Sequence, residues 1–246
     1  MLLTTISTGS KGNTYILDAG DESIILDAGV PAKKTLVKLR NYDGLAGVLI
    51  THEHQDHAKA WADYLRRGIR IYTSQGTKDA LAHSSGDLLA KAIVALQPLK
   101  AIRAKHFVIM PFEAEHDAAQ PVGFLIRYEP TGETVIYATD TYYLRYTFPN
   151  VNYWIVECNY CDELIENTEA GSVLHMRLLQ AHMSLRRLKD ALRANDLSKT
   201  RKIVLVHLSD ERSDEARMIR EIEELTGIET EAARDASTIR LDLTPF

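Results

Sequence analysis

The chain reads Thr51-His52-Glu53-His54-Gln55-Asp56-His57 at the end of an apolar run. Three imidazoles and an aspartate within six residues are hard to explain by packing, whereas these groups are ligands that suit zinc and neighbouring metals. The apolar run, residues 45–50, is typical of a buried strand, and residues 58–67 have the pattern of a helix. We therefore expect a metal site on the turn that leaves this strand. A histidine-rich surface loop is the alternative.

The spacing of these residues fits two metal ions better than one. His52 and His54 are two positions apart in an extended segment, so both side chains can point at one ion. Asp56 and His57 follow where the chain tightens into the helix, so they face a second position. A closed structural zinc site is usually rich in cysteine, and the chain has only two cysteines. A catalytic site with an open position is the better prediction.

Further candidate ligands follow other strand-like runs. Asp140 and His207 each end an apolar run, and His116 lies between two more such runs. A lone carboxylate at a strand end, such as Asp140, is well placed to bridge two cations. Taken singly, each residue could be a strand-terminal polar residue without a role. In this order, and together with the first motif, they favour a metal centre.

In the order and approximate spacing of these residues, the chain resembles the metallo-β-lactamase superfamily, and the resemblance extends over nearly its whole length. The opening Ser7-Thr8-Gly9-Ser10-Lys11-Gly12-Asn13 looks like the SxGSxGN opening of the YycJ/WalJ-like branch, on the nuclease and phosphodiesterase side of the superfamily. Residues 115–124, 138–141 and 207–209 are similar to that branch as well. The resemblance implies an α+β fold, the four-layer αββα sandwich, with a single metallo-β-lactamase-like domain over residues 1–246.

The resemblance also implies two divalent metal ions, Zn²⁺ or Mn²⁺, and a set of metal ligands: His52, His54, Asp56, His57, His116, Asp140 and His207. The first two histidines and His116 would hold metal 1. The Asp-His pair and His207 would hold metal 2. Asp140 would bridge the ions together with a water or hydroxide, the nucleophile. Asp27, in an early Asp-Ala-Gly element, would orient a ligand without touching metal, and a solvated turn residue is the alternative.

Two residues are the catalytic candidates, Asp56 and His182. The leaving alkoxide of a phosphodiester needs a proton or a metal contact. His182 is placed where phosphodiesterase relatives carry a His-x-Ser element at the start of a helix, and Ser184 would cap that helix. A solvent-facing His182 without a role is the alternative. Ala181 replaces the glycine that relatives often have before this histidine, which changes the expected loop.

The composition limits the classes to which the chain can belong. Its 246 residues, 45% of them hydrophobic, suit one domain with a sizeable core. No apolar stretch reaches about 18 residues and no secretory signal is visible, so we expect no membrane partner. Two cysteines suggest a reducing compartment, and we expect a cytoplasmic protein. Relatives often pair, so a homodimer is a further expectation.

The net charge of −5 is not typical of a nucleic-acid binder, but basic residues are unevenly spread. Seven lysines and arginines lie between residues 186 and 202, against two aspartates. Such a stretch can contact phosphates, or it can be a solvated helix face. Residues 210–235 are acidic, and we expect them to face away from a polyanion. Tyr142 and Tyr143 could stack on a base, although packing is the commoner use of such aromatics.

Hydrophobic patterns predict strands at residues 2–7, 14–17, 23–27, 47–51, 69–73, 107–110, 122–128, 134–138, 153–156, 203–206 and 238–243. They predict helices near residues 31–40, 57–67, 75–83, 184–195 and 211–226. Runs of strands with interspersed helices indicate two packed sheets with helices outside. Residues 79–104 are expected to carry a helix and a loop that cover the active site.

We therefore predict a metal-dependent phosphodiester hydrolase, specifically a nuclease that acts on DNA or RNA. Two ions about 3.5–4 Å apart would clamp a phosphoryl group and lower the pKa of the water between them. One alternative is a hydrolase of a small cyclic phosphodiester, a thioester or a lactone on the same scaffold. The other is a non-catalytic sandwich that binds a partner, and the complete set of ligands argues against it.

Overall fold

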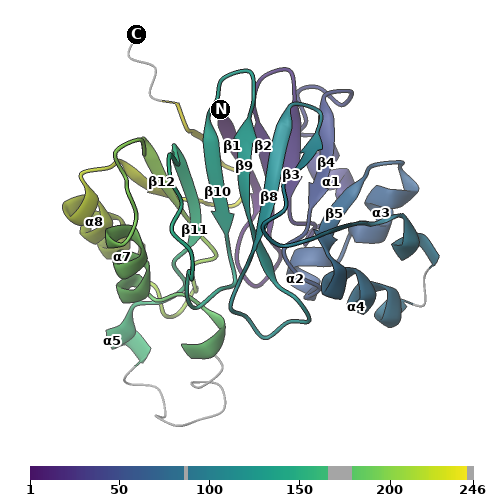
Figure 1. Cartoon of the computed structure of the whole chain (residues 1–246). Coiled ribbons are helices and arrows are strands. Elements are labelled where there is room, and N and C mark those ends of the chain that lie inside the picture. Colours follow the sequence, from purple (N-terminus) through teal and green to yellow (C-terminus); the bar gives the residue numbers. More distant parts are fainter. Residues whose placement is uncertain (86–87, 166–178, 243–246) are drawn as a thin grey trace.

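Two β-sheets form the centre of the molecule (Figure 1). The computed structural model describes residues 1–85, 88–165 and 179–242. One seven-stranded sheet has the order β14 (Thr238–Arg240), β1 (Leu2–Ser7), β2 (Thr14–Asp18), β3 (Ser23–Leu26), β4 (Leu45–Leu49), β5 (Ile71–Ser74) and β6 (Val94–Leu96). The other has the order β13 (Thr230–Ala232), β12 (Lys202–Val206), β11 (Tyr153–Glu157), β10 (Thr134–Ala138), β9 (Val122–Tyr128), β8 (Phe107–Glu113) and β7 (Ile102–Ala104).

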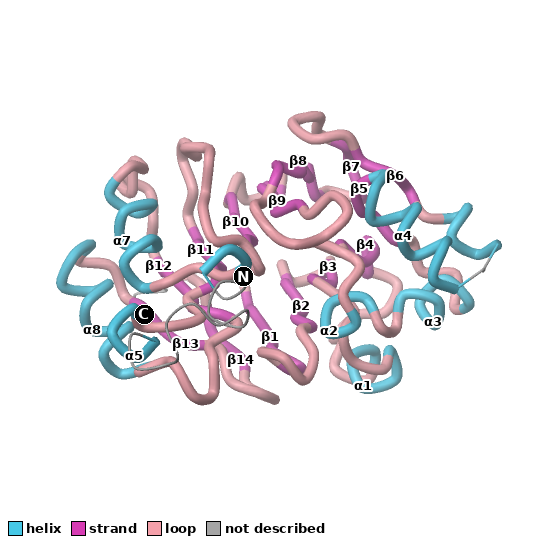
Figure 2. Tube along the Cα trace, turned by 90° about the horizontal axis from the view of Figure 1, so that it is seen from below, coloured by secondary structure: helices cyan, strands magenta, loops and turns pink. Residues whose placement is uncertain are grey.

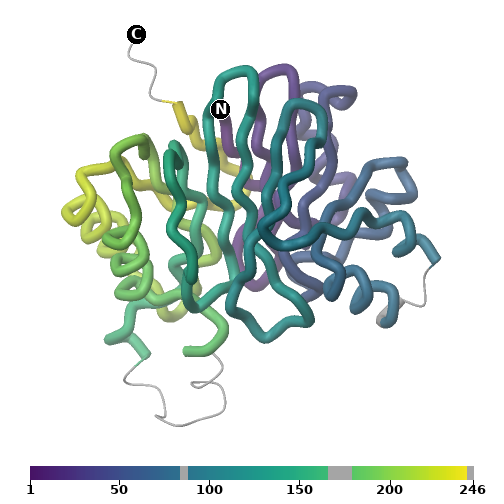
Figure 3. Tube along the Cα trace, in the orientation of Figure 1, coloured from purple at the N-terminus to yellow at the C-terminus, as the bar shows by residue number. Residues whose placement is uncertain are grey.

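Helices lie on the two outer sides of this pair of sheets, as Figures 2 and 3 show. Beside the first sheet lie α1 (Ala32–Leu36), α2 (Gln55–Ala58), α3 (Trp61–Arg66), α4 (Gln75–Ser85) and the 3₁₀ helix η1 (Leu88–Ala92). Beside the second sheet lie α5 (Asp162–Ile165), α7 (Leu185–Arg193) and α8 (Glu215–Thr226). This is the four-layer αββα sandwich, which confirms the predicted fold class. Within the described residues, no helix combines the length and the apolar character that crossing a membrane requires.

Three clusters of buried side chains correspond to the three interfaces between the layers. The first packs the sheets against each other and includes Leu17 and Phe124. The second joins Trp154 of the second sheet to Leu188 of α7, and the third packs Trp61 of α3 on the first sheet. Since inner strands are covered on both faces, every residue of β10 is buried. Such strands appear in the sequence as continuous apolar runs, which explains why they could be predicted.

Helix α7 shows how the sequence builds an outer layer next to the site. Its three leucines are buried on one face, and its charged residues occupy the rest of the surface. Ser184 lies at the N-cap, and its side chain accepts a hydrogen bond from the backbone N–H of Arg187 at 3.3 Å. This confirms the predicted cap and fixes the start of the helix just after His182.

Parallel strands bring the site together at one edge of the sandwich. The run β3-β4-β5-β6 is parallel in the first sheet, and β10-β11-β12-β13 is parallel in the second. Their carboxyl ends lie at the lower edge in Figure 1, which Figure 2 views directly. Loops that follow the carboxyl ends of parallel strands commonly bind ligands, because they converge from several strands at one place.

The observed elements correct the sequence-based prediction in three places. The described part of residues 79–104 forms the end of α4, η1, β6 and β7, which complete one edge of each sheet. None of these described residues lines the two cavities that border the predicted ligands. The predicted helix over residues 57–67 is divided into α2 and α3. The last strand ends at Arg240, and its predicted extension to Leu243 passes beyond the described residues.

Candidate metal centre

Three histidines form one half of a cluster at this edge. His52 and His54 follow β4, and His116 lies between β8 and β9. One ligand atom of each lies within 4.8 Å of the others. His116 Nε2 lies 3.2 Å from His54 Nδ1, and His116 Nδ1 donates to the Ala181 carbonyl at 2.8 Å. The carbonyl therefore fixes the tautomer of His116, with Nε2 directed into the cluster.

Two aspartates and two histidines form the other half. Asp56 and His57 lie in α2, Asp140 follows β10, and His207 follows β12, with their ligand atoms within 4.8 Å of one another. Asp140 Oδ1 lies 2.7 Å from His207 Nδ1 and 3.1 Å from His57 Nε2. Its Oδ2 lies 3.7 Å from His116 Nε2 in the first half. Asp140 thus contacts both halves, which is where a bridging carboxylate has to lie.

Three site residues have a left-handed backbone at the ends of their strands. The φ angle is 58° at Asp27, 48° at Asp140 and 54° at His207. This conformation costs about 1–2 kcal/mol for a residue with a Cβ. Strained residues persist where the surrounding structure holds them, and they gather at functional sites. The sharp turns let each chain leave its strand while its side chain stays at the cluster.

Asp27 is fully buried, so it is not a solvated turn residue. It contacts His57 on the side of the ring that faces away from the cluster. Its Oδ2 lies 2.9 Å from His57 Nδ1 and accepts a hydrogen bond from the Tyr137 hydroxyl at 2.6 Å. Its Oδ1 accepts from the backbone N–H and the hydroxyl of Thr51 at 2.8 and 3.0 Å. These contacts direct His57 Nε2 toward the cluster. Because Tyr137 belongs to the second sheet, they also join the two sheets beneath the site.

Two N-terminal loops pack against α2, which carries Asp56 and His57. The Asn13 N–H donates to the Asp56 carbonyl at 2.6 Å, and Asn13 Nδ2 lies 3.0 Å from His57 Nε2. Gly29 passes so close that a Cβ at this position would lie 1.8 Å from the Asp56 carbonyl oxygen. The opening motif therefore forms a turn that lines the site. It is not a phosphate loop of the nucleotide-binding kind, because a strand and not a helix follows it.

The donor set and its charges fit divalent metal ions. His52 Nε2 is buried and has no hydrogen-bond partner among the described residues. Burial, aided by the neighbouring His57, keeps the pKa of His52 well below its usual value, so the ring stays in the neutral form that binds metal. Burial also opposes charge on His57 and His207. There Asp140 and other carboxylates outweigh burial, raising the pKa of His57 well above its usual value and that of His207 to about 10. Protons thus compete with a cation for this half of the cluster.

Glu157 is a site residue outside the predicted sets of metal ligands and catalytic residues. It ends β11 and is fully buried, and its Oε1 lies 2.6 Å from His182 Nδ1 and 3.3 Å from His207 Nδ1. Its Oε2 accepts two backbone hydrogen bonds at 3.0 and 3.2 Å. The strand-end rule that selects Asp140 applies equally to Glu157 and could have found it.

His182 lies against the cluster and is only partly exposed to water. Its side chain is 22% exposed, and its Nδ1 lies 3.9 Å from Asp140 Oδ2. Together with Asp140, Glu157 and His207 it forms a third group with the spacing of metal ligands. Since several donors already engage both oxygens of Glu157, we assign this carboxylate to positioning His182 rather than to binding metal.

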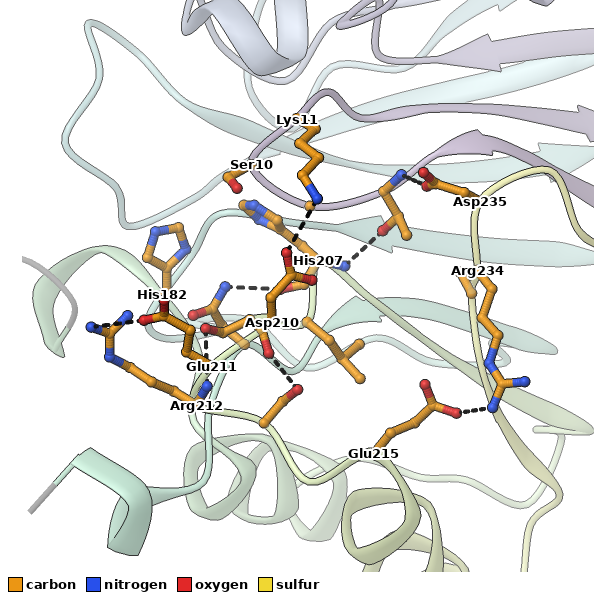
Figure 4. Close-up of a pocket in the computed structure, with 17 residues that line it drawn as sticks. Ser10, Lys11, His182, His207, Asp210, Glu211, Arg212, Glu215, Arg234 and Asp235 are labelled. Atoms are coloured by element: carbon orange, nitrogen blue, oxygen red, sulfur yellow. Dashed lines mark hydrogen bonds and ion pairs between the residues drawn. The ribbon is translucent and has the colours of Figure 1, made fainter. Parts of the chain in front are cut away.

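A cavity of about 690 Å³ opens beside the second half of the cluster (Figure 4). His182 and His207 line it, together with residues 8–11, 208–213 and 233–235. Residues 210–213, 215 and 233–235 thus line this cavity, although the sequence predicts that the acidic stretch faces away from a polyanion. The chain leaves β12 at His207, so the acidic residues that follow have to pass the site before α8 begins.

The basic stretch over residues 186–202 is largely neutralised by carboxylates. Lys189 Nζ lies 2.7 Å from Glu221, and Lys202 Nζ lies 2.6 Å from Glu231. Further arginines of the stretch have carboxylate partners too: Arg186, Arg193 and Arg201. Of the two expectations for this stretch, the charged helix face fits the structure. A phosphate-binding patch stays a prediction.

Comparison with known proteins agrees with the fold. A family model described as a β-lactamase superfamily domain matches residues 14–208, and the chain belongs to this superfamily. Exodeoxyribonuclease WalJ of Streptococcus pneumoniae is 26% identical over 245 residues, which cover 94% of this chain and 88% of the relative. Exodeoxyribonuclease YycJ of Bacillus anthracis is 24% identical over 217 residues, covering 83% and 81%. The metallo-β-lactamase fold protein YhfI from Bacillus subtilis superimposes with a TM-score of 0.71 at 20% identity, covering 97% and 98%. These relatives confirm the resemblance to the YycJ/WalJ-like branch.

Replacing Asp27 by alanine is expected to weaken metal binding by about 10–100-fold, the usual effect of losing a carboxylate that orients a ligating histidine. Competition with a chromophoric chelator measures the affinity. Tyr137→Phe removes only one of the hydrogen bonds to Asp27 and is the matched control, with a smaller expected loss. Wild-type affinity in a folded Asp27→Ala variant would show that His57 does not depend on its carboxylate partner.

Proposed function

We propose that the chain is a metal-dependent phosphodiester hydrolase that removes nucleotides from the ends of DNA. The main observation is the pair of ligand groups joined by Asp140, because two adjacent cations suit phosphoryl transfer. The relatives are named exodeoxyribonucleases, which supports a nuclease and supports DNA as its substrate. The cavity beside His207 provides room for a strand next to the cluster.

Two sets of ligands would hold the ions: His52, His54 and His116 for the first, and Asp56, His57 and His207 for the second, with Asp140 shared. When bound, the ions would neutralise phosphoryl oxygens and lower the pKa of an attacking water. Asp56 is the most exposed carboxylate of the cluster, with 27% of its side chain accessible against 3% for Asp140. We assign Asp56 to receiving the proton of that water on the open side of the site.

His182 is placed to protonate the leaving alkoxide. Its Nδ1 is held by Glu157, so Nε2 is the nitrogen left to face the substrate. Burial opposes a charge on this ring, but Glu157 outweighs burial and raises the pKa of His182 above its usual value. A histidine with a raised pKa keeps its proton to higher pH, which suits a general acid.

Imidazole nitrogen and carboxylate oxygen accept either Zn²⁺ or Mn²⁺, and we propose these two as the candidate native ions. We also propose a cytoplasmic location, supported by two cysteines that are buried and free, Cys158 and Cys161. A homodimer stays a prediction.

Turnover of metal-reconstituted protein tests the proposal. Separate zinc and manganese samples are assayed on end-labelled duplex DNA, matched RNA, bis-p-nitrophenyl phosphate, a thioester and a lactone. Release of mononucleotides from DNA ends that is lost in Asp56→Ala and retained in Asp63→Ala, an exposed carboxylate on α3, supports it. Turnover of the thioester or the lactone with DNA untouched would overturn it in favour of a carbonyl-ester hydrolase.

A further inference from the structure

Two cavities flank the cluster and differ in their chemistry. One, of about 440 Å³, is lined by His116 of the first half and by Tyr142, Gln180 and two carboxylates. The other, of about 690 Å³, is lined by His207 of the second half, by three cations and by four carboxylates. A phosphodiester at the cluster carries two substituents on phosphorus, and each needs a space. The two cavities offer one space on each side.

The smaller cavity suits an uncharged heterocycle. Arg187 lies behind the Tyr142 ring, with Cζ 5.2 Å from the ring centroid, and its guanidinium is fixed by donation to the Leu179 carbonyl at 2.6 Å. A ring supported in this way offers a stacking surface for a base. No lysine or arginine among the described residues lines this cavity, and its carboxylates, Glu115 and Asp117, can accept hydrogen bonds from a base. Arg145 pairs with Glu115 but does not line the cavity.

The larger cavity differs from the smaller one in containing cations, and Lys11 is the cation that we assign to phosphate. In Figure 4 this side chain extends from the opening turn toward Asp210 on the opposite loop. The two charges are 3.5 Å apart, and both side chains are more than four-fifths exposed, at 82% and 81%. A pair this exposed contributes little stability, so a phosphate can displace Asp210 from Lys11. The other two cations of the cavity, Arg212 and Arg234, each have a neighbouring carboxylate as partner.

We propose that each of the two cavities binds the part of a DNA strand on one side of the cleaved bond. The base of the nucleotide on one side of the cleaved bond stacks on Tyr142, and the backbone phosphates on the other side run past Lys11. This assignment rests on the proposed nuclease function and adds how the strand is held. It predicts that recognition of the base and recognition of the backbone can be removed independently.

A double-mutant cycle tests the base subsite. Single-stranded oligonucleotides with a normal or an abasic terminal nucleotide, at either end, are digested by metal-loaded wild type and Tyr142→Ala. Stacking on an aromatic ring is worth about tenfold or more in affinity. We expect Tyr142→Ala to lower kcat/KM about tenfold on the normal oligonucleotide and to leave the abasic one unchanged. Tyr142→Phe keeps the ring and is expected to restore the dependence on the base. Equal losses on both oligonucleotides would overturn the base subsite, while cleavage by the wild type would still support the nuclease.

The salt dependence of kcat/KM tests the phosphate subsite. Removing one phosphate contact from a single strand reduces the slope of log affinity against log salt by about 0.7. We expect this reduction for Lys11→Ala, and a lower KM for Asp210→Asn, which frees the lysine. Arg70→Ala is the matched control, because Arg70 lines a different cavity, near the amino ends of β4 and β5. An unchanged slope in Lys11→Ala, or the same reduction in Arg70→Ala, would overturn the assignment of Lys11.

Discussion

Asp140→Asn is expected to lower kcat on DNA by about 10³-fold or more and to reduce the bound metal. A bridging carboxylate holds both ions in place, and losing that stabilisation removes several kcal/mol from the transition state. Asparagine has nearly the same shape and tolerates the left-handed backbone seen here, where φ is 48°, so the variant removes charge without disturbing the turn. Rapid-quench digestion of labelled DNA, with metal content measured on the same samples, gives both quantities.

The control for this variant is Asp190→Asn. Asp190 is an exposed carboxylate on α7 that pairs with Arg193, away from the cluster, and its replacement is expected to leave kcat and metal content unchanged. A folded Asp140→Asn variant with wild-type turnover and full metal content would rule out the bridging position of Asp140.

His182→Ala is expected to keep the bound metal and to slow cleavage of DNA by about 10²–10⁴-fold, the usual contribution of a general acid. The loss should be far smaller on bis-p-nitrophenyl phosphate, because p-nitrophenolate leaves without a proton. A measurement of kcat on both substrates shows whether the loss depends on the leaving group's need for a proton. Equal losses on both would mean that His182 binds metal or shapes the site and does not supply a proton.

Glu157→Gln is expected to change the pH dependence of kcat, because Glu157 contacts His182. Glu157 raises the pKa of His182, so its loss is expected to lower that pKa. An acid with a raised pKa remains protonated to higher pH, and activity is lost as pH rises through that pKa. The alkaline limb of the kcat profile should therefore move to lower pH in Glu157→Gln. An unshifted limb would show that another group supplies the proton.

The strands around the site were predictable because strands buried on both faces appear in the sequence as continuous runs of apolar residues. The predicted bounds of β9 and β10 agree with the structure, since both strands lie inside the sandwich. The candidate ligands could be found because each follows such a run. The edge strands β6, β7 and β13 contain three residues each, which is too short to show a period.

The parts of the site that could not be predicted depend on three-dimensional neighbours. The engagement of Glu157 by His182 joins residues that are 25 positions apart, and no local pattern records it. The net charge of residues 210–235 suggests distance from a polyanion, but connectivity places their first residues in the cavity wall. The basic residues of α7 appear available in the sequence, whereas their partners, such as Glu221, lie on α8.

The most direct test of the central claim is a titration of metal into chelator-stripped protein while release of mononucleotides from end-labelled duplex DNA is followed. Two adjacent ions act together in phosphoryl transfer. We therefore expect little cleavage after the first equivalent of Mn²⁺ or Zn²⁺, full cleavage after the second, and none at any metal level in Asp140→Asn. Full cleavage by the stripped protein, or full cleavage at one equivalent, would contradict a two-metal phosphodiesterase.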